Sequence, residues 1–220
     1  MADFTLVIGN RASSSWSLRG WLALKRTGAA FDEERVWFKR PDTKAQILSH
    51  SPSGLVPVLK HKRDEGELLI WETLAIIEYL AELFPAAGLW PEDIAARASA
   101  RAVSTEMHAG FSPLRNHMPM DLQNRKPGQG MGEGVAENIK RISEIWEDCR
   151  DRFGKDGDFL FGAFSAADIM FAPVVTRFRT YGVALNPVCR AYDDAVLNTP
   201  DMKEWTEGAL AEPPPGEVAV

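Results

Sequence analysis

The sequence has few cysteines and no recognisable pattern of metal ligands. Cys149 and Cys189 are the two cysteines of the chain, they lie far apart, and neither belongs to a Cys-x-x-Cys pair. The sequence therefore indicates neither a disulfide framework nor a dithiol redox site. We expect both to be buried, unreactive thiols. The four histidines form no ligand spacing typical of a metal site, so we expect no metal.

Charge and hydropathy exclude two further classes of protein. The formal net charge is -6 at pH 7, so there is no general basic surface for nucleic acid or anionic lipid. No stretch reaches the roughly 20 apolar residues that a membrane helix needs, and the N-terminus lacks the pattern of a signal peptide. We expect a cytoplasmic protein with no nucleic acid and no membrane partner. The 220 residues, 45% of them hydrophobic, suffice for one large or two small domains.

Strand and helix signals alternate in the first 84 residues. Phe4 to Ile8 is a short apolar run, typical of a strand covered on both faces. A helical pattern follows and ends at Gly28, where a left-handed C-cap is expected. A single helix between two strands usually makes them parallel neighbours. We expect strands at 4–8, 31–38, 56–59 and 68–71, the last two as a hairpin, and helices at 17–28 and 73–84, with a short helix after the second strand.

Beyond Pro85 the strand signals almost vanish. The glycine-rich segment 125–134 follows no strand and lacks the Gly-Lys-Ser/Thr ending of a phosphate-binding loop, so we interpret it as a flexible connector. We expect the tail, 212–220, to extend into solvent. Helix-like spacing or composition occurs at 94–107, 135–153, 165–181 and 191–198.

Pro57 lies inside an apolar strand run, where a proline cannot donate a sheet hydrogen bond. If the peptide bond between Val56 and Pro57 is cis, the backbone amide and carbonyl of Val56 turn outward. They can then pair with an extended peptide as if it were an added strand. An edge-strand proline without a ligand fits these residues equally well.

Glu72 and Thr73 stand where an apolar strand ends and a helix begins. The first backbone amides of a helix have no partner within it, and they attract anions. The pair can hold the α-ammonium and the α-carboxylate of a peptide-like ligand. Plain helix capping is the more common reason for such a pair.

Ser13, Ser14 and Ser15 form the turn between the first strand and the first helix, where a βα unit usually presents its ligand-facing loop. A serine hydroxyl can donate a hydrogen bond to a bound sulfur, and the positive end of a helix also favours a thiolate. Each unit by which the pKa of a thiol is lowered corresponds to about 1.4 kcal/mol of preferential stabilisation of the thiolate. For any single serine here, helix capping is the alternative.

In this combination and order, the three features resemble the glutathione transferase family. The resemblance covers nearly the whole chain and is carried by Gly-Leu-Val-Pro-Val-Leu at 54–59, Glu-Thr at 72–73 and Phe-Ser-Ala-Ala-Asp at 164–168. The third motif is similar to a capping box of the family, so we assign Asp168 to stability and not to catalysis. The resemblance implies α/β plus all-α architecture: a thioredoxin-like N-terminal domain at 1–84, a linker at 85–91 and an all-helical C-terminal domain at 92–220.

The resemblance also implies glutathione as a co-substrate. Ser14 is then the residue that stabilises the thiolate, with Ser13 and Ser15 as alternatives, and Val56, Pro57, Glu72 and Thr73 bind glutathione. The Ser-Ser-x-Trp turn, with Arg19 after it, is similar to zeta-class enzymes and to a group of bacterial transferases. Zeta members carry Ser-Ser-Cys where this chain has serines alone, which weakens the transfer of their isomerase activity.

In the family, the first long helix of the second domain faces the thiol. His108, Phe111 and Arg115 are therefore candidates to line the pocket of a small hydrophobic electrophile, although their spacing also suits a helix interface with polar edges. The resemblance implies a homodimeric glutathione transferase, with detoxification as its role. The alternatives are a glutathione-dependent cis-trans isomerase of the maleylacetoacetate type and a non-catalytic glutathione-binding stress protein.

Overall fold

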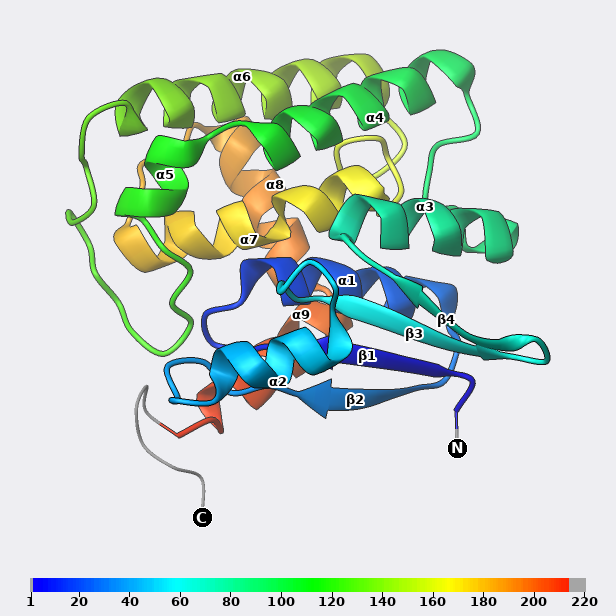
Figure 1. Cartoon of the computed structure of the whole chain (residues 1–220). Helices are drawn as coiled ribbons and strands as arrows, with labels where there is room; N and C mark the ends of the chain where they lie inside the picture. Colours follow the sequence, from blue (N-terminus) through cyan, green and yellow to red (C-terminus); the bar gives the residue numbers. More distant parts are fainter. Residues whose placement is uncertain (1, 214–220) are drawn as a thin grey trace. The chain divides into compact units, whose positions relative to one another are not determined.

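A computed structural model of the chain describes residues 2–213. The chain divides into two compact units (Figure 1). The first consists of residues 2–87 and 204–213, and the second of Gly88–Lys203. Within the described residues no helix is both long and apolar enough to cross a membrane.

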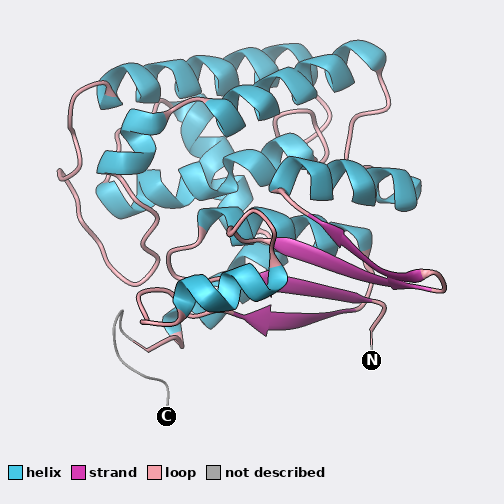
Figure 2. Ribbon diagram, in the orientation of Figure 1, coloured by secondary structure: helices cyan, strands magenta, loops and turns pink. Residues whose placement is uncertain are grey.

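The first unit is built on a four-stranded sheet, drawn in magenta in Figure 2, and the labels of Figure 1 give its strand order, β2-β1-β3-β4. β1 pairs in parallel with β2 and antiparallel with β3, and β3 forms a hairpin with β4. The expected parallel pair and hairpin are thus confirmed. The hairpin reaches further into charged sequence than expected, because its tip is exposed and needs no apolar side chains. The strands are β1 (Phe4–Ile8), β2 (Phe31–Arg35), β3 (Val58–Arg63) and β4 (Gly66–Ile70).

Helices cover both faces of this sheet. A Cβ placed on Gly20 of α1 would lie 3.7 Å from Leu6 Cδ1, so Leu6 faces α1. The next residue, Val7, points to the opposite face and belongs to a cluster that includes Ile47 of α2. Successive side chains of a strand point to opposite faces of the sheet. Because helices cover both faces, β1 is apolar on both sides. The helices are α1 (Ser15–Thr27), α2 (Thr43–His50), α3 (Thr73–Leu83) and the 3-10 turn η1 (Pro85–Ala87), and α9 (Pro200–Leu210) joins this unit from Glu204 onward.

The second unit is helical, as expected. Trp146 is completely buried at its centre, where its ring contacts Phe171, Phe178 and Tyr192. The thioredoxin-like domain and the helical domain of the sequence prediction are confirmed, while the segments that form α5 and α9 were not predicted as helices. The helices are α4 (Ile94–Ala109), α5 (Ser112–His117), α6 (Val135–Phe153), α7 (Ala166–Tyr181) and α8 (Pro187–Asn198), followed by the start of α9.

Asp168 caps the start of α7, as the sequence predicted. Its carboxylate accepts hydrogen bonds from Ser165 N at 2.8 Å, Ser165 Oγ at 3.0 Å and Leu160 N at 3.1 Å. The capping box with Ser165 is complete. Asp168 is completely buried, so its role is to hold the helix start and the preceding loop together.

Replacing Asp168 by alanine should lower the free energy of unfolding by about 2–4 kcal/mol, because buried amides lose their acceptor. Burial raises the pKa of Asp168 from its ordinary value of 3.8 to about 6. The part of its stabilising contribution that depends on protonation is therefore complete below pH 4 and is lost as pH rises through 6. Urea unfolding should show a larger penalty at pH 4 than at pH 7, by as much as about 3 kcal/mol.

The matched control is Asp148→Ala on α6, where the exposed carboxylate pairs with Arg152 at 2.9 Å. Exposed pairs of this kind contribute about 0.5 kcal/mol or less. A penalty for Asp168→Ala no larger than that of this control would contradict the structural assignment.

Candidate active site

The register of the sheet brings three of the predicted segments to one edge. Val7, near the end of β1, pairs with Val58 at the start of β3, and Leu59 pairs with Ile70 at the end of β4. The serine turn after β1, the segment before β3 and the helix start after β4 therefore leave the sheet on the same side. The three features read separately from the sequence therefore lie at the same end of the sheet.

Ser14 is at the N-cap position of α1, but its side chain accepts no capping hydrogen bond. Instead, its Oγ lies 2.7 Å from Ser17 Oγ, and Ser17 Oγ accepts a hydrogen bond from the Gly9 amide at 3.0 Å. Ser14 is only 6% exposed. When Ser17 donates to Ser14, the Ser14 proton is available to a ligand at the helix N-terminus. Capping by this hydroxyl, the alternative from sequence, does not occur.

The neighbouring serines have different environments. Ser13 is exposed, whereas Ser15 is buried as the first residue of α1. The Ser15 carbonyl accepts a hydrogen bond from Arg19 Nη1 at 3.4 Å, and the Arg19 guanidinium lies 4.2 Å from the centre of the Trp16 ring. Arg19 is completely buried, so it fixes the first turn of α1 from within.

The peptide bond between Val56 and Pro57 is cis, which meets the condition set by the sequence hypothesis. Within residues 2–213 the Val56 backbone amide has no hydrogen-bond partner. A Cβ on Gly20 would lie 3.0 Å from Pro57 Cγ, so the segment approaches α1 closely at this glycine. The Val56 side chain packs against the buried Val7 cluster, which anchors the segment.

Glu72 and Thr73 stand at the start of α3, as expected. Glu72 is the N-cap residue, yet its side chain accepts no capping hydrogen bond, and it is exposed. Thr73 is the first helical residue and is 1% exposed. The peptide bond between Trp71 and Glu72 is also cis. Side-chain capping by Glu72 is therefore not what the structure shows.

Neither cysteine belongs to this site. Cys149 and Cys189 are both buried and both lie in the second unit. Burial raises the pKa of Cys149 to about 12 and also raises the pKa of Cys189, so both thiols stay protonated at neutral pH. The expectation of buried thiols is confirmed. Among residues 2–213 no group of three or more His, Cys, Asp or Glu side chains is arranged to hold a metal ion.

The three residues predicted to line the electrophile pocket lie around the end of α4 and the start of α5. Arg115 Nη1 donates to the His108 carbonyl at 3.1 Å, and burial lowers the pKa of Arg115. His108 is partly buried. Phe111 has φ 60 and is 7% exposed.

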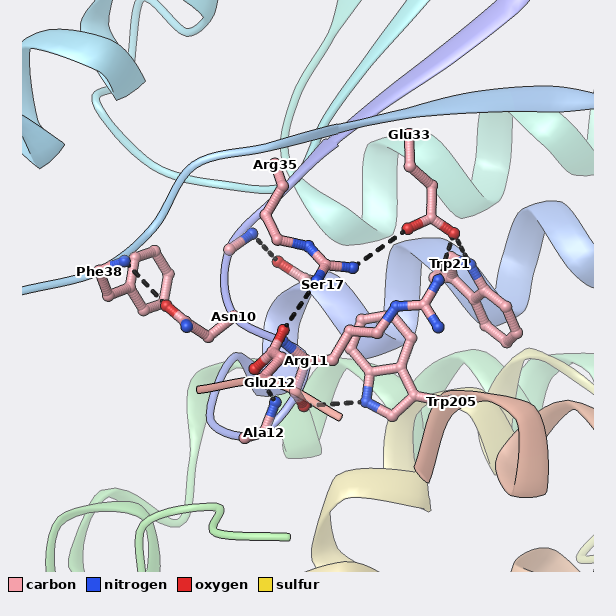
Figure 3. Close-up of polar contacts among 11 residues, drawn as sticks. Asn10, Arg11, Ala12, Ser17, Trp21, Glu33, Arg35, Phe38, Trp205 and Glu212 are labelled. Carbon is pink, nitrogen blue, oxygen red and sulfur yellow. Dashed lines mark hydrogen bonds and ion pairs between the residues drawn. The ribbon is translucent and has the colours of Figure 1, made fainter. Parts of the chain in front are cut away.

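Sequence reasoning missed two residues near the serine turn. One lies in α1, and the other lies close to the C-terminus. Ser17 follows Ser14 at the i+3 spacing that brings side chains together on a helix, a signal that was available. Glu212 reaches the turn from the C-terminus (Figure 3). The expectation that the tail extends into solvent is wrong for Glu212, which is 6% exposed because it is bonded to the turn. Residues 214–220 of that tail lie outside the described part of the chain.

Comparisons with known proteins agree with this geometry. Residues 13–83 match the family model for the glutathione S-transferase N-terminal domain, and residues 132–207 match that for the C-terminal domain. A maleylacetoacetate isomerase of Pseudomonas aeruginosa is 30% identical over 185 residues, covering 80% of this chain and 82% of the relative. Glutathione S-transferase 1 of Dianthus caryophyllus is 29% identical over 192 residues, covering 84% and 83%.

A solved structure shows the same fold. A glutathione transferase homolog from Burkholderia, determined with bound glutathione, superposes with a TM-score of 0.71 at 23% identity and covers 94% of this chain and 97% of that one. The sheet topology, the helical second unit and the two matching domain models lead to one conclusion. The chain belongs to the glutathione S-transferase family.

Proposed function

We propose that this protein binds glutathione and stabilises its thiolate for attack on a small hydrophobic electrophile, as a glutathione transferase. The observation that carries the proposal is the buried Ser14 hydroxyl, paired with Ser17 at 2.7 Å and placed at the N-terminus of α1. A hydroxyl with that orientation can donate to sulfur, and the helix end adds favourable positive potential. Ser13 and Ser15 remain the alternatives for this role.

The backbone and the γ-glutamyl end of glutathione have matching groups at this end of the sheet. The unpaired Val56 amide pairs with the backbone of the bound peptide as an added strand would. The Glu72 carboxylate binds the α-ammonium of the γ-glutamyl end. The amide and hydroxyl of Thr73, at the start of α3, bind the α-carboxylate. These contacts place the thiol beside the serine turn, with Pro57 closing one side.

The chemistry requires no covalent enzyme intermediate. Bound glutathione loses its thiol proton to solvent, and Ser14 donates a hydrogen bond to the resulting thiolate. The thiolate forms a carbon–sulfur bond with the electrophile, and the leaving group takes the electron pair, or a proton is added to the neighbouring carbon of an alkene. We propose that His108, Phe111 and Arg115 contact the electrophile, and that the enzyme is a homodimer in the cytoplasm with a role in detoxification.

A second candidate function is glutathione-dependent cis-trans isomerisation, which the 30% identical maleylacetoacetate isomerase favours. In that reaction the thiolate adds to a cis alkene, the former double bond rotates as a single bond, and elimination releases the trans alkene and glutathione. The two functions differ in what is consumed. With maleylacetone as the probe, a transferase accumulates a glutathione adduct, while an isomerase returns all glutathione and yields fumarylacetone.

Calorimetric titration with glutathione tests the proposal at its first step. We expect binding of one glutathione per chain, and similar affinity for S-methylglutathione, which keeps both ends of the peptide but has no ionisable thiol. Proton release, measured in buffers of different ionisation enthalpy, should accompany binding of glutathione alone. Absence of binding would reject the proposed function, and binding without proton release or turnover would favour the non-catalytic protein.

A further inference from the structure

The carboxylate of Glu212, just after α9, binds the backbone immediately before the serine turn. Glu212 Oε1 accepts the amide of Arg11 at 2.6 Å, and Oε2 accepts the amide of Ala12 at 3.0 Å (Figure 3). Arg11 and Glu212 are 201 residues apart in sequence. The Glu212 side chain is 1% exposed, so the carboxylate is enclosed by the groups that it binds.

The charge of this buried carboxylate is compensated from the sheet. Arg35 Nη1, at the end of β2, lies 3.2 Å from Glu212 Oε1. A carboxylate that accepts two amides and pairs with a guanidinium has its main interactions satisfied, which makes burial of the charge tolerable.

Trp205 of α9 also binds the backbone of Arg11. Its Nε1 donates to the Arg11 carbonyl at 3.0 Å. The Arg11 guanidinium lies 5.1 Å from the centre of the Trp205 ring and 5.4 Å from that of Trp21, and it pairs with Glu33 at 2.5 Å. Gly208 allows this approach, since a Cβ there would lie 2.3 Å from Arg11 Nη1. Both backbone polar groups of Arg11 are therefore bound by the C-terminal segment.

The residues bound in this way lie immediately before the serine turn. Arg11 and Ala12 precede Ser13, and the Ser14 amide closes the turn by donating to the Asn10 carbonyl at 2.8 Å. The Ser14 hydroxyl also contacts Ser17 Oγ at 2.7 Å, and Asn10 Oδ1 accepts the Phe38 amide at 2.8 Å. Residues 205 and 212 thus supply one donor and two acceptors to the backbone that leads into the turn.

We propose that Glu212, assisted by Trp205, is a positioning residue that completes the thiol site by fixing the backbone of the turn that carries Ser14. The inference rests on the proposed function, because it assigns Glu212 a role in thiolate stabilisation. Glu212 acts through the turn and touches neither the thiol nor the electrophile. A link that merely joins the two ends of the chain would affect stability alone, whereas a positioning role changes the pKa of the bound thiol.

The decisive variant is Glu212→Gln, which keeps the size of the side chain but has one acceptor oxygen in place of two. The side-chain NH2 group cannot accept a hydrogen bond, so either Arg11 or Ala12 loses its acceptor. Trp205→Phe is the second variant, since it keeps an aromatic ring and removes the donor to Arg11. The matched control is Glu204→Gln on the same segment, where an exposed carboxylate pairs with Lys25 at 2.7 Å and does not reach the turn.

We expect Glu212→Gln to raise the pKa of the bound glutathione thiol by about half a unit to one unit and to lower kcat about tenfold, with KM for glutathione within about threefold of wild type. Trp205→Phe should also raise the thiol pKa and lower kcat, each by a smaller amount. Glu204→Gln should leave the thiol pKa and kcat unchanged. If Glu212→Gln lowers the unfolding midpoint while the thiol pKa and kcat stay at wild-type values, the positioning role is wrong.

Hydrogen exchange without ligand separates this inference from the proposed function. The amides of Arg11 and Ala12 should exchange at least tenfold faster in Glu212→Gln than in Glu204→Gln, whether or not the protein binds glutathione. Unchanged exchange overturns the inference. If exchange is faster in Glu212→Gln but the wild-type protein does not bind glutathione, the proposed function is rejected, and the positioning role with it, while the contact itself stands.

Discussion

Replacing Ser14 by alanine should raise the pKa of the bound glutathione thiol by about 1–2 units and lower kcat/KM near pH 6.5 by about 10–100-fold. A hydrogen bond to a charged group contributes about 1.5–3 kcal/mol, and this one exists only when the sulfur is ionised. The affinity for S-methylglutathione should stay within about twofold of wild type, because Ser14 does not contact the peptide ends. Absorbance titration of the thiolate, together with calorimetry, measures both quantities.

Ser13→Ala is the matched control for this result, because Ser13 lies next to Ser14 in the same turn and is exposed. It should leave the thiol pKa unchanged. The opposite pattern, with a shift in Ser13→Ala and none in Ser14→Ala, would move the catalytic assignment to Ser13. A shift seen only in Ser15→Ala would move it to Ser15.

Glu72→Gln should weaken glutathione binding by about 10–100-fold and leave the pKa of the bound thiol unchanged. Glu72 is exposed at the start of α3, and its carboxylate provides the negative charge for the γ-glutamyl ammonium. The variant keeps the size of the side chain and removes the charge. Calorimetric titration of the variant with glutathione measures the affinity. The thiol pKa is then measured again with the variant saturated by glutathione.

Glu82→Gln is the control for charge alone, since Glu82 is also exposed on α3 but lies near its other end. It should bind glutathione as the wild type does. Wild-type affinity in Glu72→Gln would refute the assignment of the γ-glutamyl subsite. Because Ser14→Ala changes the thiol pKa and Glu72→Gln changes affinity, the two variants test independent parts of the site.

The elements with strong local patterns could be predicted from the sequence. β1 and α6 have the predicted bounds, because a five-residue run that is apolar except for Thr5 and a 19-residue amphipathic helix leave few alternatives. α5 could not be found in this way, since six residues are too few to show a period. In α9, Gly208 weakens the helical pattern, and the structure gives the reason: the Arg11 side chain occupies the space of a Cβ.

The candidate site could be proposed from sequence where its features lie in local motifs. Val56, Glu72 and the serines stand in short segments whose residue types have a specific backbone context, and the sheet register then brings them to one edge. The contact of Glu212 with the turn was beyond such reasoning. No periodicity or motif connects two residues 201 positions apart, and a single glutamate near proline residues is typical of an exposed tail.

The central claim is that this protein lowers the pKa of the glutathione thiol that it binds. The most direct measurement is the ultraviolet absorbance of the thiolate in the wild-type complex across pH, with the complex of S-methylglutathione as the blank. A free thiol ionises with a pKa of about 8.5, and we expect the bound thiol to be half ionised at least one unit lower. A midpoint equal to that of free glutathione would contradict the account.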